Sequence, residues 1–242
     1  MNRNGGLTEL QPENAEASSP GALLWVKIVL GQSVLNAAAR RFWSSDELPR
    51  LLPPFLLELY SLVSCSVPLM RAAHERASEL ASTDPLAAIT ARYLQQHIEE
   101  EAHHDEWLLD DLVASGMDRT AVLQRWPSAN VASLVGAQYC WIRHAHPAAL
   151  FGYLAVIEGN PPLAEHLDEI QAQSGYPAES FRCLHQHAAD DIEHLRELRS
   201  TIVDLPLRAQ HETLIASSAF ATVSGLSQIF EDLMTKVQGI RK

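Results

Sequence analysis

Residues 181–202, FRCLHQHAADDIEHLRELRSTI, form the stretch that decides the fold of this chain. Read as a helix, the segment places one stripe of side chains at steps of three or four residues, the spacing of a face that packs on a core. The stripe consists of Phe181, Leu184, His187, Asp191, His194, Leu198 and Ile202. Its two imidazoles and one carboxylate are metal-ligand types, and burying such ionisable groups is costly unless a charge such as a divalent cation compensates them.

The same segment also fits another register, in which Ala188, Ile192 and Leu195 face the core and the polar stripe is a solvated surface. A second stretch, residues 86–112, LAAITARYLQQHIEEEAHHDEWLLDDL, favours the metal interpretation. It repeats the pattern with Tyr93, His97, Glu101, His104, Leu108 and Leu112. Glu101-x-x-His104 and Asp191-x-x-His194 are the same unit, and helical bundles that hold two iron or manganese ions are built from such units. The lack of thiolate ligands argues against structural zinc.

Composition limits the partners and the compartment. The net charge of -12 and the pI near 5.3 argue against binding to nucleic acid or to an anionic membrane, because both need clustered Lys and Arg. Cys65, Cys140 and Cys183 form no CxxC pair, so we expect reduced thiols in a cytoplasmic protein.

The chain is expected to be all-α. No segment alternates apolar and polar residues over strand length, and helical patterns follow one another from Pro20 to the C-terminal end. Residues 1–19 are expected to be a disordered or loosely packed leader, and residues 20–242 a single domain of about eight helices. Lys27, Gln32 and Asn36 interrupt the first apolar run, which argues against a membrane span. The apolar last helix could support a homodimer.

A third carboxylate, Glu158, ends the apolar segment PAALFGYLAVIEG. Taken alone, such a residue is more often half-exposed at a helix end than a ligand. However, three motifs follow one another in this chain: Glu-x-x-His, then this Glu about fifty residues on, and then His-x3-Asp-x2-His. This order resembles the haem-oxygenase-like diiron oxidases, also called the iron-containing redox enzyme family, over roughly residues 20–240. The resemblance implies a haem-oxygenase-like bundle of seven to eight helices that holds two Fe(II) ions, with manganese as an alternative metal. The ligands that it implies are Glu101, His104, Glu158, His187, Asp191 and His194.

One position departs from the family pattern. Some members supply their first carboxylate two turns before the first histidine, where this chain has His97. We therefore expect the carboxylate to come from Glu101 or, less naturally, from Glu100. His97 is then either a hydrogen-bond partner of a ligand or a seventh ligand.

The resemblance implies a biosynthetic oxidase that activates O2 and has no catalytic residues beyond the metal ligands. Its substrate would be a small amino acid, amine or carboxylate-bearing metabolite, changed by N-oxygenation, desaturation or carbon–carbon cleavage, and an external electron donor could be needed. Arg143 could bind the substrate carboxylate, with Tyr139 and His146 on approximately the same helix face, although a structural ion pair is the alternative for Arg143. Two other functions stay open: a cofactor-free thiaminase-like or quinone-synthase-like enzyme of the same fold, and a non-enzymatic metal-binding protein.

Overall fold

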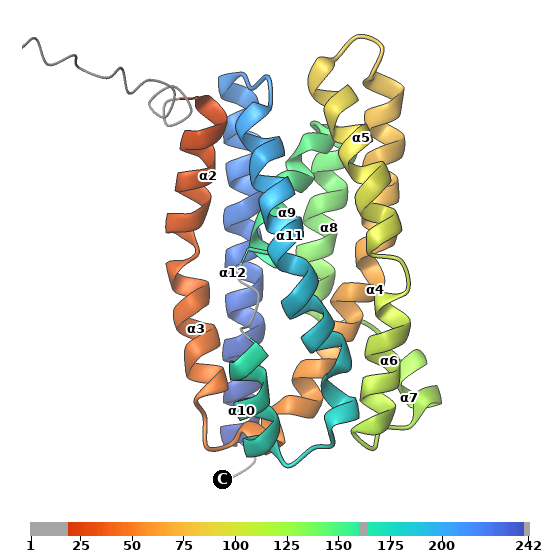
Figure 1. The fold of residues 1–242 in the computed structure, drawn as a ribbon, viewed down its shortest axis with the longest axis vertical. Helices are drawn as coiled ribbons and strands as arrows, with labels where there is room; N and C mark the ends of the chain where they lie inside the picture. Colours follow the sequence, from red (N-terminus) through yellow and green to blue (C-terminus); the bar gives the residue numbers. More distant parts are fainter. Residues whose placement is uncertain (1–18, 160–163, 240–242) are drawn as a thin grey trace, which may run out of the picture.

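The structure, a computed structural model, describes residues 19–159 and 164–239 and, within these, all side chains except those of Ala164, Glu165, Asp191 and Gln238. The described residues form helices and no strand, which confirms the all-α prediction (Figure 1). The helices are α2 (Pro20–Gly31), α3 (Ser33–Trp43), α4 (Leu48–Leu80), α5 (Pro85–Glu100), α6 (His104–Ala114), α7 (Arg119–Leu123), α8 (Ala129–His144), α9 (Leu150–Ile157), α10 (Ala164–Ser174), α11 (Arg182–Asp204) and α12 (Ala209–Gly239). Short 3-10 turns cover Pro147–Ala149 and Ala178–Phe181. Most of the expected leader lies outside the described residues.

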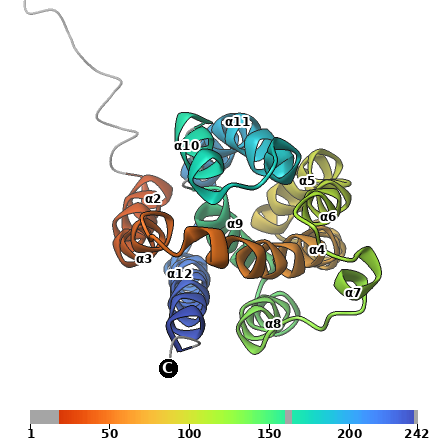
Figure 2. The ribbon, with the colours of Figure 1, turned by 90° about the horizontal axis from the view of Figure 1, so that it is seen from below.

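Helix α9 lies at the centre of the bundle, surrounded by longer helices (Figure 2). Its residues are buried except for the half-buried Ile157. Gly152 allows α9 to approach α12 closely, because a Cβ atom at this position would lie 2.1 Å from the Ile215 carbonyl oxygen. The position of Glu158, directly after α9, therefore follows from an apolar helix that packs on neighbours along its length.

Two helices expected to be continuous are broken. Residues 20–43 form α2 and α3, which meet at Gln32, and residues 86–112 form α5 and α6, separated by Glu101–His103. His103 adopts a left-handed backbone conformation with φ of 74°. This conformation places Cβ close to the backbone and costs about 1–2 kcal/mol for a non-glycine residue. Glu101 and His104 consequently flank a break and do not lie one turn apart on a continuous helix.

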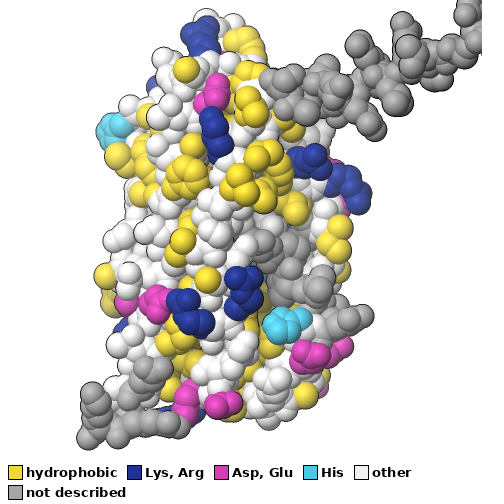
Figure 3. All heavy atoms as spheres, turned by 90° about the vertical axis from the view of Figure 1, so that its left-hand side faces the viewer, with side chains coloured by type: hydrophobic (Ala, Val, Ile, Leu, Met, Phe, Trp, Pro, Cys, Tyr) yellow, Lys and Arg dark blue, Asp and Glu magenta, His cyan; other side chains and the backbone are white. Residues whose placement is uncertain are grey.

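Helices α2 and α3 bury one face and expose the other. Leu23, Val26, Leu30 and Val34 are exposed, Leu30 by 70%. Figure 3 shows this side of the molecule, on which hydrophobic side chains gather in the upper half. By length and composition alone, residues 20–43, 48–80 and 209–237 could each cross a membrane. We expected Lys27, Gln32 and Asn36 to leave the first apolar run too short to span a membrane, and this expectation was wrong. The absence of a membrane partner stays a prediction.

Candidate metal centre

The break between α5 and α6 places two of the predicted ligands. Asp84 caps the start of α5 by accepting hydrogen bonds from the backbone N–H groups of Leu86 and Ala87. The helix then runs to Glu100, and Glu101 occupies the position that ends it. After the left-handed residue His103, the chain re-enters a helix at His104. Both Glu101 and His104 are buried by this turn of the chain.

One group of potential ligands, here called cluster A, consists of Glu101, His104 and His187. Each residue offers a ligand atom, and these atoms lie within 4.8 Å of one another. Glu101 Oε2 lies 2.9 Å from His104 Nδ1. The rings of His104 and His187 meet edge to face, with their centroids 4.7 Å apart. Cluster A thus joins the α5–α6 break to α11.

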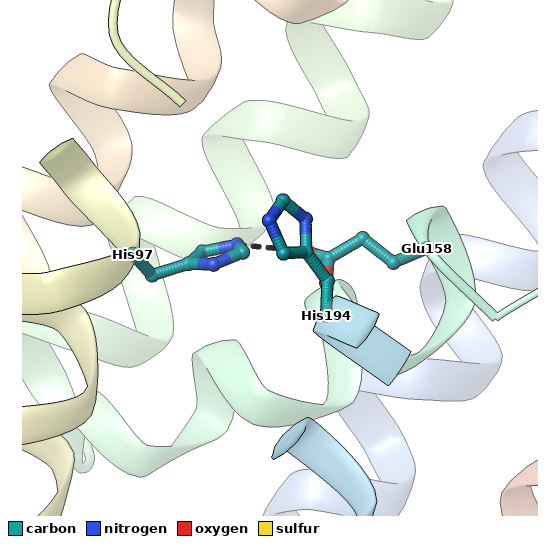
Figure 4. Close-up of side chains that lie close together, drawn as sticks. All are labelled: His97, Glu158 and His194. Atoms are coloured by element: carbon teal, nitrogen blue, oxygen red, sulfur yellow. Dashed lines mark hydrogen bonds and ion pairs between the residues drawn. The ribbon is translucent and has the colours of Figure 1, made fainter. Parts of the chain in front are cut away.

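A second group, cluster B, consists of His97, Glu158 and His194, which come from α5, the end of α9 and α11 (Figure 4). Their ligand atoms also lie within 4.8 Å of one another. His97 Nε2 and Glu158 Oε1 share a hydrogen bond of 2.9 Å. The His194 ring approaches the His97 ring edge to face at 5.1 Å. Cluster B therefore gathers three helices around one point in the interior.

Glu101 connects the two clusters. Its Oε2 atom faces His104 in cluster A, whereas its Oε1 atom lies 3.6 Å from His194 Nδ1 in cluster B. Glu100 lies at the edge of cluster B, with its Oε2 atom 3.4 Å from His97 Nδ1 and 3.7 Å from His194 Nε2. A carboxylate whose two oxygens point to two ligand groups can bridge a pair of metal ions. Glu101 has this geometry, and Glu100 contributes only from the side of cluster B.

Burial and charge act against each other at these groups. Burial disfavours the charged form of His97, but the hydrogen bond and charge of Glu158, together with the charges of Glu101 and Glu100, outweigh it and raise the pKa of His97 to about 9. Burial likewise opposes ionisation of Glu101, yet the hydrogen bond from His104 and the nearby imidazoles lower the pKa of this carboxyl. The site therefore has buried anionic groups that a cation would stabilise.

Tyr93 closes one side of cluster B. Its ring stacks on His97 with the centroids 5.4 Å apart and contacts Phe151 at 5.3 Å. The Tyr93 hydroxyl is buried and has no hydrogen-bond partner among the described residues. Burial, followed by the charge of Glu158, raises the pKa of this phenol. A buried hydroxyl without a protein partner is consistent with a site that accepts a further group.

The structure brings together five of the six predicted ligands: Glu101, His104, Glu158, His187 and His194. The side chain of Asp191 lies outside the described residues, although its backbone belongs to α11 between the two histidines of that helix. His97 belongs to cluster B and also shares a hydrogen bond with Glu158, so its position is compatible with both roles that the sequence left open. The assignment of all these residues as iron ligands stays a prediction.

The residues predicted to bind substrate lie on α8 and directly before the Pro147–Ala149 turn that follows it. Arg143 is exposed on α8 and forms no ion pair with a described residue, and Tyr139 is half-buried on the same helix. His146 caps the turn at Pro147–Ala149, and its Nε2 atom lies 3.1 Å from Asp84 Oδ2. Both ring nitrogens of His146 are thus engaged in positioning the chain. Among the described residues, no hydrogen bond, ion pair or ring contact links these three side chains to cluster A or cluster B, and their role in binding substrate stays a prediction.

Comparisons with known proteins bear on the family and on the fold. The family described as "Iron-containing redox enzyme" matches residues 55–224. No curated protein matches the chain. Among solved structures, a domain of unknown function with a heme oxygenase-like fold from Shewanella denitrificans has a TM-score of 0.68 at 15% identity over 97% of both chains. A TenA homolog from Pseudomonas syringae pv. tomato also has a TM-score of 0.68, at 14% identity, covering 97% of this chain and 99% of that one.

A CADD-like protein of unknown function from Nostoc punctiforme has a TM-score of 0.55 at 14% identity, covering 91% of this chain and 89% of that one. Identities this low establish shared folds and no shared activity. The all-α bundle is therefore haem-oxygenase-like, as predicted.

Proposed function

This chain belongs to the iron-containing redox enzyme family, and from that membership we propose that it is a non-haem diiron oxidase. It uses O2 to oxidise a small amino acid, amine or carboxylate-bearing metabolite, by N-oxygenation, desaturation or carbon–carbon cleavage. An external electron donor could complete the reaction. The observation that carries the proposal is the convergence of cluster A and cluster B on the two oxygens of one buried carboxylate, Glu101.

The donor set fits iron. Imidazole nitrogens and carboxylate oxygens suit iron and manganese, and neither cluster contains a thiolate or a Lys or Arg side chain. One ion would be held by cluster A and the other by cluster B, with Asp191 as a further expected ligand. When bound, two ferrous ions supply electrons for the reduction of O2. With Glu101, Glu158 and Asp191 ionised, two dications leave the site near +1, a charge that favours substrates with a carboxylate.

The protein residues keep this site dry and ordered. Tyr93 covers His97 of cluster B with its ring and is itself packed on Phe151, and His97 holds the Glu158 carboxylate through its hydrogen bond. Each ligand comes from a packed helix or from the residue directly after one, so its position is set by the bundle. A substrate that reaches the clusters meets preformed ligands shielded from bulk water.

A cofactor-free enzyme of the same fold, thiaminase-like or quinone-synthase-like in its chemistry, is the second candidate. The His97–Glu158 pair favours it, because a buried imidazole with a pKa of about 9 and a carboxylate at 2.9 Å could transfer a proton to or from a bound substrate. In that case both clusters are acid–base groups, and no iron binding is expected.

Anaerobic titration of the metal-free protein with ferrous iron separates the two functions. We expect about two iron ions to bind per chain. His187→Ala removes a donor from cluster A only and should lower this number to about one, whereas Glu101→Ala should weaken both sites. His166→Ala is the matched control, because this histidine is half exposed on α10 and should bind iron like the wild type. Wild-type protein that binds no iron, or variants that all retain two ions, would contradict the diiron proposal.

Oxygen uptake completes the experiment. The iron-loaded protein should consume O2 when a reductant and a substrate are present, and manganese loading shows whether iron is required. The remaining expectations, a cytoplasmic protein that does not bind nucleic acid or membranes and that could form a homodimer, stay proposals. Cell fractionation tests the compartment and the association with membranes, and size determination of the purified protein tests the homodimer.

A further inference from the structure

A hollow of about 230 Å³ lies next to cluster A, between α6 and the start of α11. It is lined by Trp107, Asp110, Arg182 and Gln186. None of these residues belongs to either cluster. The hollow is smaller than a typical drug-sized pocket and suits a small metabolite.

Trp107 separates the hollow from cluster A. Its ring stacks on the His104 ring, with the centroids 4.6 Å apart and the planes inclined by 29°. The indole is nevertheless 42% exposed and lines the hollow. One aromatic side chain thus touches a candidate iron ligand and also presents a flat surface to a bound molecule. Such a surface favours a flat, unsaturated ring over a puckered one of the same size.

Arg182 provides the polar group of the hollow. Its Nε atom lies 3.3 Å from Asp111 Oδ1 and 3.3 Å from the Glu179 carbonyl oxygen, so the base of the guanidinium is anchored. Asp111 is fully buried and also accepts a 2.7 Å hydrogen bond from the Cys183 backbone N–H. The terminal nitrogens of Arg182 bond to no described residue, and 59% of the side chain is exposed. These nitrogens form the planar fork that binds carboxylates through two hydrogen bonds.

The other charge in the hollow is already compensated. Asp110 Oδ1 lies 2.8 Å from Arg119 Nη1, and both side chains are about half exposed. Arg182 is therefore the cation available to a carboxylate on the ligand, because its terminal nitrogens have no partner among the described residues. The indole and the guanidinium together select for shape and for charge.

We propose that this hollow is the entrance subsite for the substrate and that it binds a small flat carboxylate. The ring of the ligand stacks on Trp107, and its carboxylate is held by Arg182. This inference deepens the proposed function and rests on it, because the hollow has this role only if cluster A is the reaction centre. It replaces Arg143 with Arg182 as the substrate-binding arginine.

Calorimetric titration of the metal-free protein with three probes tests the proposal. Benzoate carries both features, cyclohexanecarboxylate has the charge without the flat ring, and aniline has the ring without the charge. We expect benzoate to bind roughly tenfold more tightly than either of the others, the factor typical of one aromatic stacking contact or one charge-assisted pair. Trp107→Leu should remove the preference for benzoate over cyclohexanecarboxylate, and Arg182→Gln should remove the preference over aniline.

Two matched controls identify the site. Trp126→Leu changes a tryptophan that is 87% exposed, and Arg196→Gln changes an exposed arginine of α11 that pairs with Glu193. Neither should alter binding. Because Arg182→Gln also removes a partner of the buried Asp111, its fold is checked by circular dichroism, and Trp107→Leu remains the decisive variant if that fold is lost.

Equal binding of benzoate and cyclohexanecarboxylate to the wild type, or an unchanged preference in Trp107→Leu, would overturn the subsite. Absence of benzoate binding at millimolar concentration would do the same. These measurements need no iron, so the subsite and the diiron function are tested separately. Iron binding without a preference for benzoate refutes only the subsite. A preference for benzoate without iron binding refutes only the diiron function.

Discussion

Replacement of His97 by glutamine should change how the stability of the metal-free protein depends on pH. In the folded protein the pKa of His97 is raised to about 9, against 6.5 for an ordinary histidine. Protonated His97 therefore stabilises the fold, fully below pH 6.5, and this contribution is lost as the pH rises through about 9. At 1.36 kcal/mol per factor of ten in proton affinity, the limiting contribution is about 3 kcal/mol.

The expected profile follows from this difference in proton affinity. The contribution of His97 to the free energy of unfolding is about 3 kcal/mol at pH 6, about 2 kcal/mol at pH 7.5 and close to zero at pH 9.5. Glutamine can still donate a hydrogen bond to Glu158 but carries no charge, so the variant should lack this part of the pH dependence. Wild type and variant should differ most at pH 6 and converge near pH 9.5.

Urea unfolding of the chelator-treated protein at the three pH values, followed by circular dichroism, measures the difference. His166→Gln on α10 is the control, since this half-exposed histidine belongs to neither cluster, and the variant should unfold at pH 6 with nearly the free energy of the wild type. Glu158→Gln removes the partner that raises the pKa and should reproduce the loss at pH 6. Parallel wild-type and His97→Gln profiles from pH 6 to 9.5 would refute the reasoning, because no charge at His97 would then stabilise the fold.

Other predictions concern the backbone. His103→Gly should stabilise the protein by up to about 1 kcal/mol in urea unfolding, because glycine adopts the left-handed conformation of residue 103 without strain. His103→Val should destabilise it by about 1–2 kcal/mol, and the opposite order of the two variants would contradict the strain argument. Gly152→Ala should cost more than about 2 kcal/mol in the same assay, because its Cβ would clash with the backbone of α12. Gly136→Ala on α8, where a Cβ meets nothing within 4 Å, should be neutral or slightly stabilising. An equal loss of unfolding free energy in both alanine variants would show that the close approach of α9 to α12 does not cause the loss at Gly152.

Some of this protein can be predicted from residue spacing. Steps of three and four residues follow from the 3.6-residue helical repeat, so such patterns along the chain predict the all-α class, and the shared face of His187 and His194 is a property of α11 alone. Glu101 and His104 are close in the chain, and they meet at 2.9 Å even though the helix breaks between them. Their short separation along the chain, rather than helical periodicity, brings these two side chains together.

Contacts between distant segments could not be predicted in this way. His97 and Glu158 are 61 residues apart, and their hydrogen bond depends on the relative position of α5 and the end of α9. The left-handed residue His103 and the hollow lined by Trp107 and Arg182 likewise appear only in the assembled bundle. Spacing determines which face of a helix is polar, but packing angles and the relative shift of neighbouring helices decide which faces meet. The sequence alone therefore determined the helices and most candidate ligands, and the tertiary structure decided how those ligands combine into two clusters around Glu101.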